Sequence, residues 1–383
     1  MKDEKKAPKL RFKGFTDDWE QCKAKELFES KSKKDHSDLP VLSATQENGI
    51  VFRNNLDIDI KFDTHALSNY KVVSPGDYII SLRSFQGGFE LSEKRGIISP
   101  AYTVFAFNNQ EKNKQNSTFW KYLFKRYDFI ESLKRLTFGI RDGKAISFNQ
   151  FSTLKLSFPN FDEQNKIATL LHEIDRTITL HEEKKHQLER LKSALLQKMF
   201  ADKSGYPDIR FEGFSDEWEQ RKLGDVAKIT AGGDINKGDL INKGKYPVIA
   251  NGLNNNGIVG YSNKYKIDAP AVTITGRGTL GVATARFINF TPIVRLISIK
   301  SDLDPIYLEN VINNTHFVIE STGVPQLTAP QVKRQTVILS NCHIEQTKIG
   351  SLFLTLDNAI TLHDQKLNLL KLVKQSLLQN MFI

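Results

Sequence analysis

The sequence has few cysteines and no long hydrophobic run. Cys22 and Cys342 are the only cysteines among 383 residues, too few for a disulfide framework or a four-ligand zinc site. No run of about 18 apolar residues occurs, and the N-terminal MKDEKKAPK is charged, with no apolar stretch behind it. We therefore expect a cytoplasmic protein that neither spans a membrane nor is secreted, with both thiols as packing residues.

The usual catalytic motifs are missing as well. The sequence contains no G-x-S-x-G, no C-x-x-C and no D/N-P-P-Y/F tetrad of adenine methyltransferases. His181 and His186 are five residues apart, about 140° round a helix, so they cannot share a zinc ion. The segment from Gly139 to Lys144 lacks the spacing and the Ser/Thr of a phosphate-binding loop. We expect no catalytic centre and no metal site in this chain.

One glycine-rich segment resembles a dinucleotide-binding loop. Gly276, Gly278 and Gly281 follow a strand-like run with G-x-G-x-x-G spacing. Such a loop must open a helix, whereas the following VATARFINF has the β-branched residues and the alternation of a strand. We therefore expect a turn between two strands, and an enzymatic function would rest on this motif alone.

The chain repeats itself, and the repeat defines its organisation. Residues 8–23 (PKLRFKGFTDDWEQCK) and 207–222 (PDIRFEGFSDEWEQRK) share ten identical positions at a constant offset of 199; we call each an opening motif. Residues 163–200 repeat at 345–382, at an offset of 182. The order of opening motif, variable segment and long repeated block therefore occurs twice.

The repeated 38-residue block predicts a long helix, about 57 Å at 1.5 Å per residue. Apolar residues recur at alternating spacings of four and three, which is typical of a coiled-coil seam. The predicted seam comprises Ile167, Leu171, Ile174, Ile178, His181, Lys185, Leu188, Lys192, Leu195 and Met199, and in the second copy Ile349, Phe353, Leu356, Ile360, His363, Leu367, Leu370, Lys374, Leu377 and Met381. Two matched copies favour helices that pair with each other. Leu196, Met199, Phe200, Leu378, Met381 and Phe382 at the helix ends are candidates for packing or for a partner surface, and we favour packing.

The two variable segments, 21–160 and 221–340, have short β-rich runs separated by turns. The runs are YIISL at 78–82, AYTVFAF at 101–107, AVTIT at 271–275 and IVRLISI at 293–299. The first segment has 21 basic and 15 acidic residues and the second has 14 and 8. Each therefore carries a net charge of +6, out of +10 for the whole chain. Positive charge on two separate modules favours a duplex nucleic acid as ligand, because neutralising phosphates releases counterions.

The chain divides into six parts. They are an N-terminal tail with the first opening motif (1–20), a first α/β domain (21–160), a long helix and linker (161–206), the second opening motif (207–220), a second α/β domain (221–340) and a second long helix (341–383). We thus expect an α/β (α+β) fold class, with two α/β domains separated by two long helices that pair with each other within an internal repeat.

Candidate base-reading residues lie in polar loops of both domains, since Arg suits guanine and Asn or Gln suits adenine in the major groove. In the first domain they are Thr45, Gln46, Asn48, Arg83, Ser84, Gln86, Arg141 and Lys144. In the second they are Asn251, Asn254, Asn255, Asn256, Thr275, Arg277, Thr279, Gln326 and Thr328. Arg83 and Arg277 each follow a strand-like run at matching places, and we expect them to contribute most.

These features together resemble the specificity (S) subunit of type I restriction–modification systems. The resemblance covers nearly the whole chain and rests on RFKGFTDDWEQ/RFEGFSDEWEQ, DEQNKIATLLHEIDRTI/IEQTKIGSLFLTLDNAI, LLQKMF/LLQNMF and DAPAVTITGRGTLG. It implies two target-recognition domains that each read one half of an asymmetric, interrupted double-stranded DNA target. It also implies that the two long helices form an antiparallel coiled coil, which fixes the spacer. It also implies a non-catalytic chain.

The resemblance further implies partners that carry out the chemistry. Two methylation (M) subunits would use S-adenosylmethionine to methylate adenine at N6, and two ATP- and magnesium-dependent restriction/motor (R) subunits could join them. No cofactor is expected on this chain itself. The alternative from another class is a duplicated coiled-coil scaffold or adaptor whose domains bind proteins instead of DNA.

Overall fold

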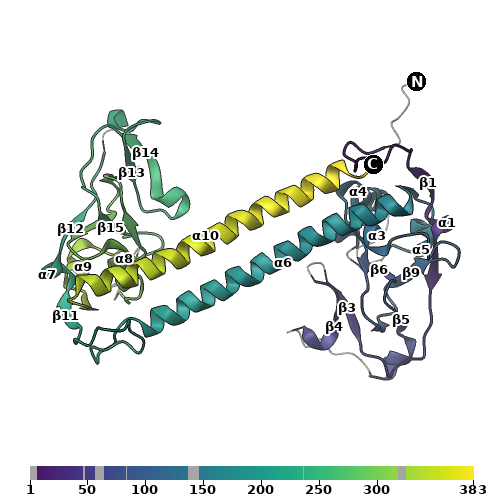
Figure 1. Ribbon diagram of the computed structural model, residues 1–383, viewed down its shortest axis with the longest axis horizontal. Helices are drawn as coiled ribbons and strands as arrows, with labels where there is room; N and C mark the ends of the chain where they lie inside the picture. The colour runs from purple at the N-terminus through teal and green to yellow at the C-terminus, as the bar shows by residue number, and fades with distance from the viewer. Residues whose placement is uncertain are drawn as a thin grey trace. The chain divides into compact units, whose positions relative to one another are not determined.

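The chain forms two compact units in a computed structural model that describes residues 7–45, 48–56, 64–82, 84–136, 146–235, 237–317 and 325–383 (Figure 1). Unit 1 comprises residues 1–181 and 366–383, and unit 2 comprises residues 182–365. Each unit has its own hydrophobic core. Among the described residues, no helix has the length and apolarity needed to cross a membrane.

Unit 1 is built on an antiparallel sheet with an aromatic core. The sheet has the order β2-β9-β6-β7, and the unit also contains three two-stranded pairs (β1-β10, β3-β4, β5-β8). The ring of Phe28 contacts six other aromatic rings at centroid distances of 4.5 to 5.8 Å. The elements are β1 (Glu20–Lys23), α1 (Ala24–Leu27), β2 (Phe28–Lys31), β3 (Leu42–Thr45), β4 (Gly49–Phe52), η1 (Arg53–Asn55), η2 (Thr64–Asn69), β5 (Lys71–Val73), β6 (Tyr78–Ile80), α2 (Ser84–Gly87), β7 (Glu90–Leu91), β8 (Gly96–Ile98), β9 (Thr103–Phe107), α3 (Ser117–Leu123), α4 (Tyr127–Leu136), α5 (Phe148–Phe151) and β10 (Lys155–Phe158).

Unit 2 has a four-stranded sheet of order β12-β18-β15-β16, a three-stranded sheet of order β14-β13-β17 and the pair β11-β19. Side chains alternate across the four-stranded sheet: Ile229, Val272 and Ile299 enter the core on one face. The elements are β11 (Glu219–Lys222), α7 (Leu223–Val226), β12 (Ala227–Ala231), η3 (Lys237–Asp239), β13 (Tyr246–Ile249), η4 (Asn254–Gly257), β14 (Ile258–Ser262), β15 (Ala271–Ile274), β16 (Ala283–Arg286), β17 (Thr291–Pro292), β18 (Ile297–Ser301), α8 (Pro305–Asn313), α9 (Ala329–Arg334) and β19 (Thr336–Leu339).

The two repeated blocks form the helices α6 (Phe161–Lys198) and α10 (His343–Asn380), each 38 residues long. Within each unit their halves run side by side in opposite directions (Figure 1). In unit 2, Lys185 Nζ lies 2.6 Å from Asp364 Oδ1 and Lys192 Nζ 2.5 Å from Asp357 Oδ1. In unit 1, Lys374 Nζ lies 2.6 Å from Asp175 Oδ1. The two residue numbers of every pair add up to 549, as an antiparallel pairing in one register requires.

The seam predicted from residue spacing is confirmed. All ten seam positions of each helix are buried or half-buried, including the polar His181, Lys185, His363 and Lys374. Leu180 and Leu362, which lie outside the seam, are 56% and 65% exposed. Glycine is a weak helix former, but at position 350 close packing explains its presence. A Cβ there would lie 2.4 Å from Asp304 Oδ1 at the start of α8.

Each opening motif packs against the end of the other copy's helix. In unit 1 the Leu10 amide donates to Asn380 O at 2.8 Å, and in unit 2 the Ile209 amide donates to Lys198 O at 2.9 Å. The rings of Trp19 and Phe382 meet edge to face with centroids 6.2 Å apart, and those of Trp218 and Phe200 do so at the same distance. Met199, Phe200, Met381 and Phe382 are buried, while Leu196 and Leu378 pack against the cores. The predicted packing role of these helix ends is therefore confirmed.

A buried ion pair joins each opening motif to the start of its own helix. Arg11 donates to both carboxylate oxygens of Glu163 at 2.9 and 2.7 Å, and Arg210 donates to both of Glu345 at 2.6 and 3.0 Å. Both glutamates have fully buried side chains in the first turn of their helices. A carboxylate is favoured at a helix start by the backbone amides and the helix dipole, and its burial requires a charged partner.

The two ion pairs differ in one respect that predicts unequal stability. Glu345 Oε2 also accepts from Trp218 Nε1 at 3.1 Å and from Ser340 Oγ at 2.5 Å, whereas Trp19 Nε1 has no partner among the described residues. We expect Glu345→Gln to lower the free energy of unfolding by about 3 kcal/mol, and by about 1 kcal/mol more than Glu163→Gln, because two further donors lose a charged acceptor. Unfolding in guanidinium, followed by tryptophan fluorescence, measures the loss of stability in each variant. Trp218 is the one tryptophan of unit 2, so its signal reports the unfolding of that unit. Equal losses of unfolding free energy in the two variants would show that the two extra donors to Glu345 add no stability.

Candidate nucleic-acid interface

Two arginines of unit 2 converge on one glutamine. Arg277 donates to Gln326 Oε1 from Nε at 3.4 Å and from Nη2 at 3.2 Å, and Arg295 donates to the same oxygen from Nη1 at 3.2 Å. Both arginines are exposed and Gln326 is half-buried. A guanidinium has five N–H donors in a fixed fork, so the shared oxygen occupies only part of each. We call Arg277, Arg295 and Gln326 the arginine cluster.

The hairpin between β15 and β16 positions Arg277. β15 and β16 pair antiparallel, so the glycine motif is a turn into a second strand, as predicted, and no helix follows it. Thr275 is buried; its hydroxyl donates to Thr279 O and accepts from the Val282 amide at 3.0 Å. The Gly276 amide donates to Asn251 Oδ1 at 2.7 Å, and Gly276 O accepts from the Leu327 amide at 3.0 Å.

A strained turn positions Arg295. Val294 and Arg295 have φ values of +52° and +62°, a backbone region that costs about 1–2 kcal/mol per residue for L side chains other than glycine. Their amides donate to Gly233 O at 3.2 Å and Gly232 O at 2.9 Å, and Asn251 Nδ2 donates to Val294 O. The predicted strand at 293–299 therefore begins only at Ile297. The early part of that prediction is wrong because positive φ values cannot continue a strand.

Sequence analysis missed Arg295 because it stood inside an apparent strand. Arg277, Gln326 and Asn251 were predicted and are brought together here, Asn251 through its two bonds to the backbones that carry the arginines. Thr328 is the N-cap residue before α9, and its hydroxyl donates to Gln331 Oε1 at 2.7 Å, a local capping bond. Asn254, Asn255 and Asn256 are exposed in η4, and Thr279 is exposed on the turn between β15 and β16.

The predicted residues of the first domain are placed separately. Thr45 ends β3, where its hydroxyl donates to Gly49 O and accepts from the Asn48 amide, both at 3.0 Å. Asn48 and Gln86 are exposed, and Ser84 is buried and accepts from the Ser81 amide at 2.7 Å. Gln46, Arg83, Arg141 and Lys144 lie outside the described residues.

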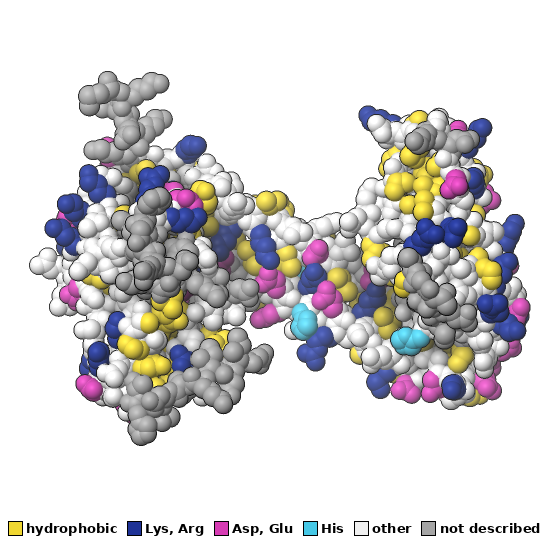
Figure 2. All heavy atoms as spheres, turned by 180° about the vertical axis from the view of Figure 1, so that it is seen from behind, with side chains coloured by type: hydrophobic (Ala, Val, Ile, Leu, Met, Phe, Trp, Pro, Cys, Tyr) yellow, Lys and Arg dark blue, Asp and Glu magenta, His cyan; other side chains and the backbone are white. Residues whose placement is uncertain are grey.

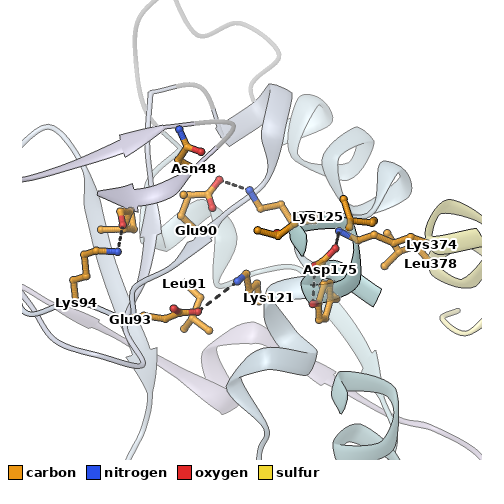
Figure 3. A pocket seen from close by; sticks show the side chains of 15 residues that line it. Asn48, Glu90, Leu91, Glu93, Lys94, Lys121, Lys125, Asp175, Lys374 and Leu378 are labelled. Atoms are coloured by element: carbon orange, nitrogen blue, oxygen red, sulfur yellow. Dashed lines mark hydrogen bonds and ion pairs between the residues drawn. The ribbon is translucent and has the colours of Figure 1, made fainter. Parts of the chain in front are cut away.

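Unit 1 has a cavity of about 580 Å³ whose lysines are largely paired (Figure 3). Lys125 pairs with Glu90, and Lys121 lies 3.6 Å from Glu93. Asp175 of α6 accepts from the Tyr122 hydroxyl at 2.8 Å and pairs with Lys374 of α10. Burial raises the pKa of Glu90, and the charge of Lys125 counteracts part of that rise. The contacts of Asp175 connect the first domain to α6 and α6 to α10. We therefore interpret the residues around this cavity as structural.

Basic side chains are distributed over both units. On the face shown in Figure 2, lysine and arginine side chains gather at several places with acidic side chains between them. In unit 2, the arginine cluster combines two adjacent positive charges with an amide on one exposed edge. An arginine fork matches guanine edges and phosphates, and a glutamine amide matches adenine edges.

The chain belongs to the family whose model is described as the type I restriction modification DNA specificity domain. That model matches residues 16–190 and again 215–372, once for each copy of the internal repeat. The match covers most of the chain and confirms the resemblance stated on the motifs.

Two relatives agree with this membership. A protein of Mycoplasma pneumoniae named as a type I specificity subunit (S.MpnORF507P) is 28% identical over 228 residues, 57% of this chain and 60% of its own length. The MjaIX specificity subunit of Methanocaldococcus jannaschii is 30% identical over 171 residues, 40% of this chain and 38% of its own. The chain thus matches at most about three-fifths of the length of these relatives.

Similarity to solved structures concerns the fold. The S subunit of a type I restriction–modification system from M. genitalium has a TM-score of 0.67 at 15% identity, covering 98% of this chain and 99% of that one. A second structure, from a study of complex assembly and conformational transition of the type I system, has a TM-score of 0.50 at 15% identity and covers 95% and 97%. The arrangement of two α/β domains and two long antiparallel helices is therefore that of this family.

The close backbone approach at Gly276 yields a prediction. A Cβ at Gly276 would lie 2.8 Å from Leu327 O and 3.1 Å from Arg295 O, so Gly276→Ala must push apart the three segments that carry the arginine cluster. We expect a loss of about 1–3 kcal/mol in the free energy of unfolding, read as a lower thermal midpoint. Gly278 has a φ of +70° and open space around it, so Gly278→Asn is the matched control with little expected effect. Equal midpoints for the two variants would show that the approach is not tight.

Proposed function

We propose that this chain is the non-catalytic DNA-specificity subunit of a type I restriction–modification complex. The observation that carries the proposal is the duplicated, family-matched unit: each copy has the same opening motif and helix, but the domain between them differs. Two different recognition domains, each held by the same opening motif and helix, suit a bipartite, asymmetric DNA target. The net charge of +6 on each variable segment supplies the sequence-independent part of DNA affinity.

Direct recognition in the second domain is assigned to the arginine cluster. Arg277 and Arg295 hold two guanidinium groups beside one amide, and a bidentate contact from one arginine to guanine discriminates by about 1–3 kcal/mol. Asn254, Asn255 and Asn256 supply further exposed amides in the same unit. In the first domain the candidates remain Thr45, Gln46, Asn48, Arg83, Ser84, Gln86, Arg141 and Lys144.

The chemistry is assigned to partner subunits in the cytoplasm. We infer two methylation subunits that use S-adenosylmethionine to methylate adenine at N6, and two restriction/motor subunits that use ATP and magnesium. Two copies of one partner fit a chain with two copies of one support. One of the similar solved structures comes from work on the assembly of a type I complex, which supports partnership in such a complex.

Genome-wide mapping of methylated adenines tests the proposal. A host that carries the methylation partner is compared with and without this chain; a bipartite methylated motif that appears only with the chain is the expected result. Arg277→Ala should relax or abolish one half of that motif and leave the other half unchanged, since each domain reads one half. Arg334→Ala, at an exposed arginine of α9, is the control. A motif independent of the chain would instead favour a protein-binding scaffold.

The paired helices are proposed to set the length of the unread spacer. Within unit 2, residues 184–190 of α6 lie opposite 359–365 of α10 in the observed register. Deleting both segments removes Lys185 together with its partner Asp364 and keeps Lys192 paired with Asp357. At 1.5 Å per residue each helix shortens by about 10 Å, roughly three base pairs.

We therefore expect methylation mapping of this double deletion to show unchanged half-sites and a spacer shorter by about three base pairs. The control replaces exposed, non-seam residues of the same two segments with alanine and keeps their length. An unchanged spacer in a folded double-deletion variant would reject the ruler role of the helices.

A further inference from the structure

A basic groove lies on the second face of the four-stranded sheet in unit 2. It has a volume of about 350 Å³ and is bounded by β12, β18, the Gly232–Gly233 turn and the segment 266–268. Because side chains alternate along a strand, Lys228 and Thr230 of β12 share this face with Ser298 and Lys300 of β18. The apolar neighbours Ile229, Ile297 and Ile299 point into the core.

Three lysines give the groove an excess of positive charge. Lys228 and Lys300 stand directly opposite each other on paired strands, an arrangement that costs stability when both carry the same charge. Lys300 Nζ donates to Asp268 O at 3.3 Å and to Pro270 O at 2.9 Å, which holds the ammonium at the groove. Lys266 is the third. Within the ranges that the structure describes, none of the three forms an ion pair.

One acidic residue, Asp268, lines the groove. Its carboxylate raises the pKa of the neighbouring Tyr265 hydroxyl. The lining therefore combines three ammonium groups with one carboxylate. A net positive charge at a partly enclosed site favours an anionic ligand.

A buried hydroxyl in the groove lacks a partner. Ser298 is 1% exposed, lines the groove, and its Oγ has no hydrogen-bond partner among the described residues. Buried polar groups are nearly always satisfied, so an exception needs a ligand, ion or water to explain it. Thr230, its cross-strand neighbour, brings a second hydroxyl to the same wall. Lysine ammonium groups and hydroxyls are the donors that a phosphate oxygen accepts.

The groove adjoins the arginine cluster through one turn. Gly232 lines the groove, and its carbonyl accepts from the amide of Arg295 at 2.9 Å. Gly233, also in the lining, has open space where a Cβ would stand. A strand of DNA whose bases face Arg277 and Arg295 would thus have the groove beside it.

We propose that this groove binds a backbone phosphate of the DNA half-site read by the second domain. The proposal rests on the proposed function and adds the place where the phosphate is held. The lining residues include no aromatic ring on which a base could stack, so the groove recognises the phosphate alone. Such a contact fixes the register of the domain on the duplex and does not itself select a sequence.

Two variants separate ligand binding from folding. Lys228→Gln removes a cross-strand repulsion and Ser298→Ala removes an unsatisfied hydroxyl, so each should leave the thermal midpoint of the full chain unchanged or raise it. Lys203→Gln, at an exposed lysine of the linker, is the control for loss of one positive charge. The probe is a duplex of mixed sequence, because a phosphate contact acts on any sequence.

Fluorescence anisotropy at several potassium chloride concentrations measures the Kd for the duplex and its dependence on salt. Lys228→Gln should reduce the slope of log Kd against log salt by about 0.9, one phosphate contact. Ser298→Ala should weaken binding roughly tenfold at every salt concentration with an unchanged slope, because it removes a neutral donor to a charged acceptor. Lys203→Gln should change neither quantity.

The outcomes distinguish the groove from the function. If the unaltered chain binds duplex with a salt-dependent Kd but both groove variants behave as Lys203→Gln does, the groove assignment is overturned and the DNA function stands. If the unaltered chain binds no duplex, the proposed function itself fails. A thermal midpoint raised by inorganic phosphate in the unaltered chain and not in Ser298→Ala, with duplex binding unchanged, would make the groove a site for a free anion and overturn the DNA assignment.

Discussion

The buried arginine–glutamate pair at the start of each long helix is the interaction on which the architecture depends. Glu163 and Glu345 have no exposed side-chain surface, and burying a carboxylate costs several kcal/mol unless a charged partner with good geometry offsets it. Arg11 and Arg210 meet that need from the opening motifs. Each opening motif must therefore lie against its own helix start, which places β1 beside β10 and β11 beside β19.

That placement brings the ends of every variable domain close together. The first domain leaves the support at β1 and returns at β10, and the second leaves at β11 and returns at β19. The same opening motifs also bind the end of the other helix, through Leu10 to Asn380 and Ile209 to Lys198. The repeated residues thus form a closed support within each unit. Residues between the fixed strands can change without altering this support, which explains why the two domains have diverged while their supports have not.

Sequence patterns predicted the parts of the fold that depend on local periodicity. The helices, their seam and the packing of Met199 and Met381 follow from the spacing of apolar residues, and the turn after Thr275 follows from the alternation in VATARFINF. The arginine cluster could not be predicted in the same way. Arg277 meets Gln326 across 49 residues, and Arg295 reaches it only through a turn with positive φ at Val294. Side chains that meet only through tertiary structure leave no periodic signal in the sequence. Valine rarely adopts a positive φ, so the sequence also gives no sign of the turn at Val294.

The unfavourable features of unit 2 are concentrated around one turn. Val294 and Arg295 have strained backbones, Arg295 donates to Gly232 beside the groove, and in the groove Lys228 faces Lys300 and Ser298 lacks a partner. In the cavity of unit 1, by contrast, Lys121, Lys125 and Lys374 each pair with a carboxylate. Violations of local rules are expected where function requires them and are offset elsewhere. An anionic ligand would remove two of these costs at once. Its charge would offset the repulsion between Lys228 and Lys300, and its oxygen would accept a hydrogen bond from the Ser298 hydroxyl. Among the residues that the structure describes, no ion pair or hydrogen bond offsets either cost, which is the physical ground for proposing an anionic ligand here.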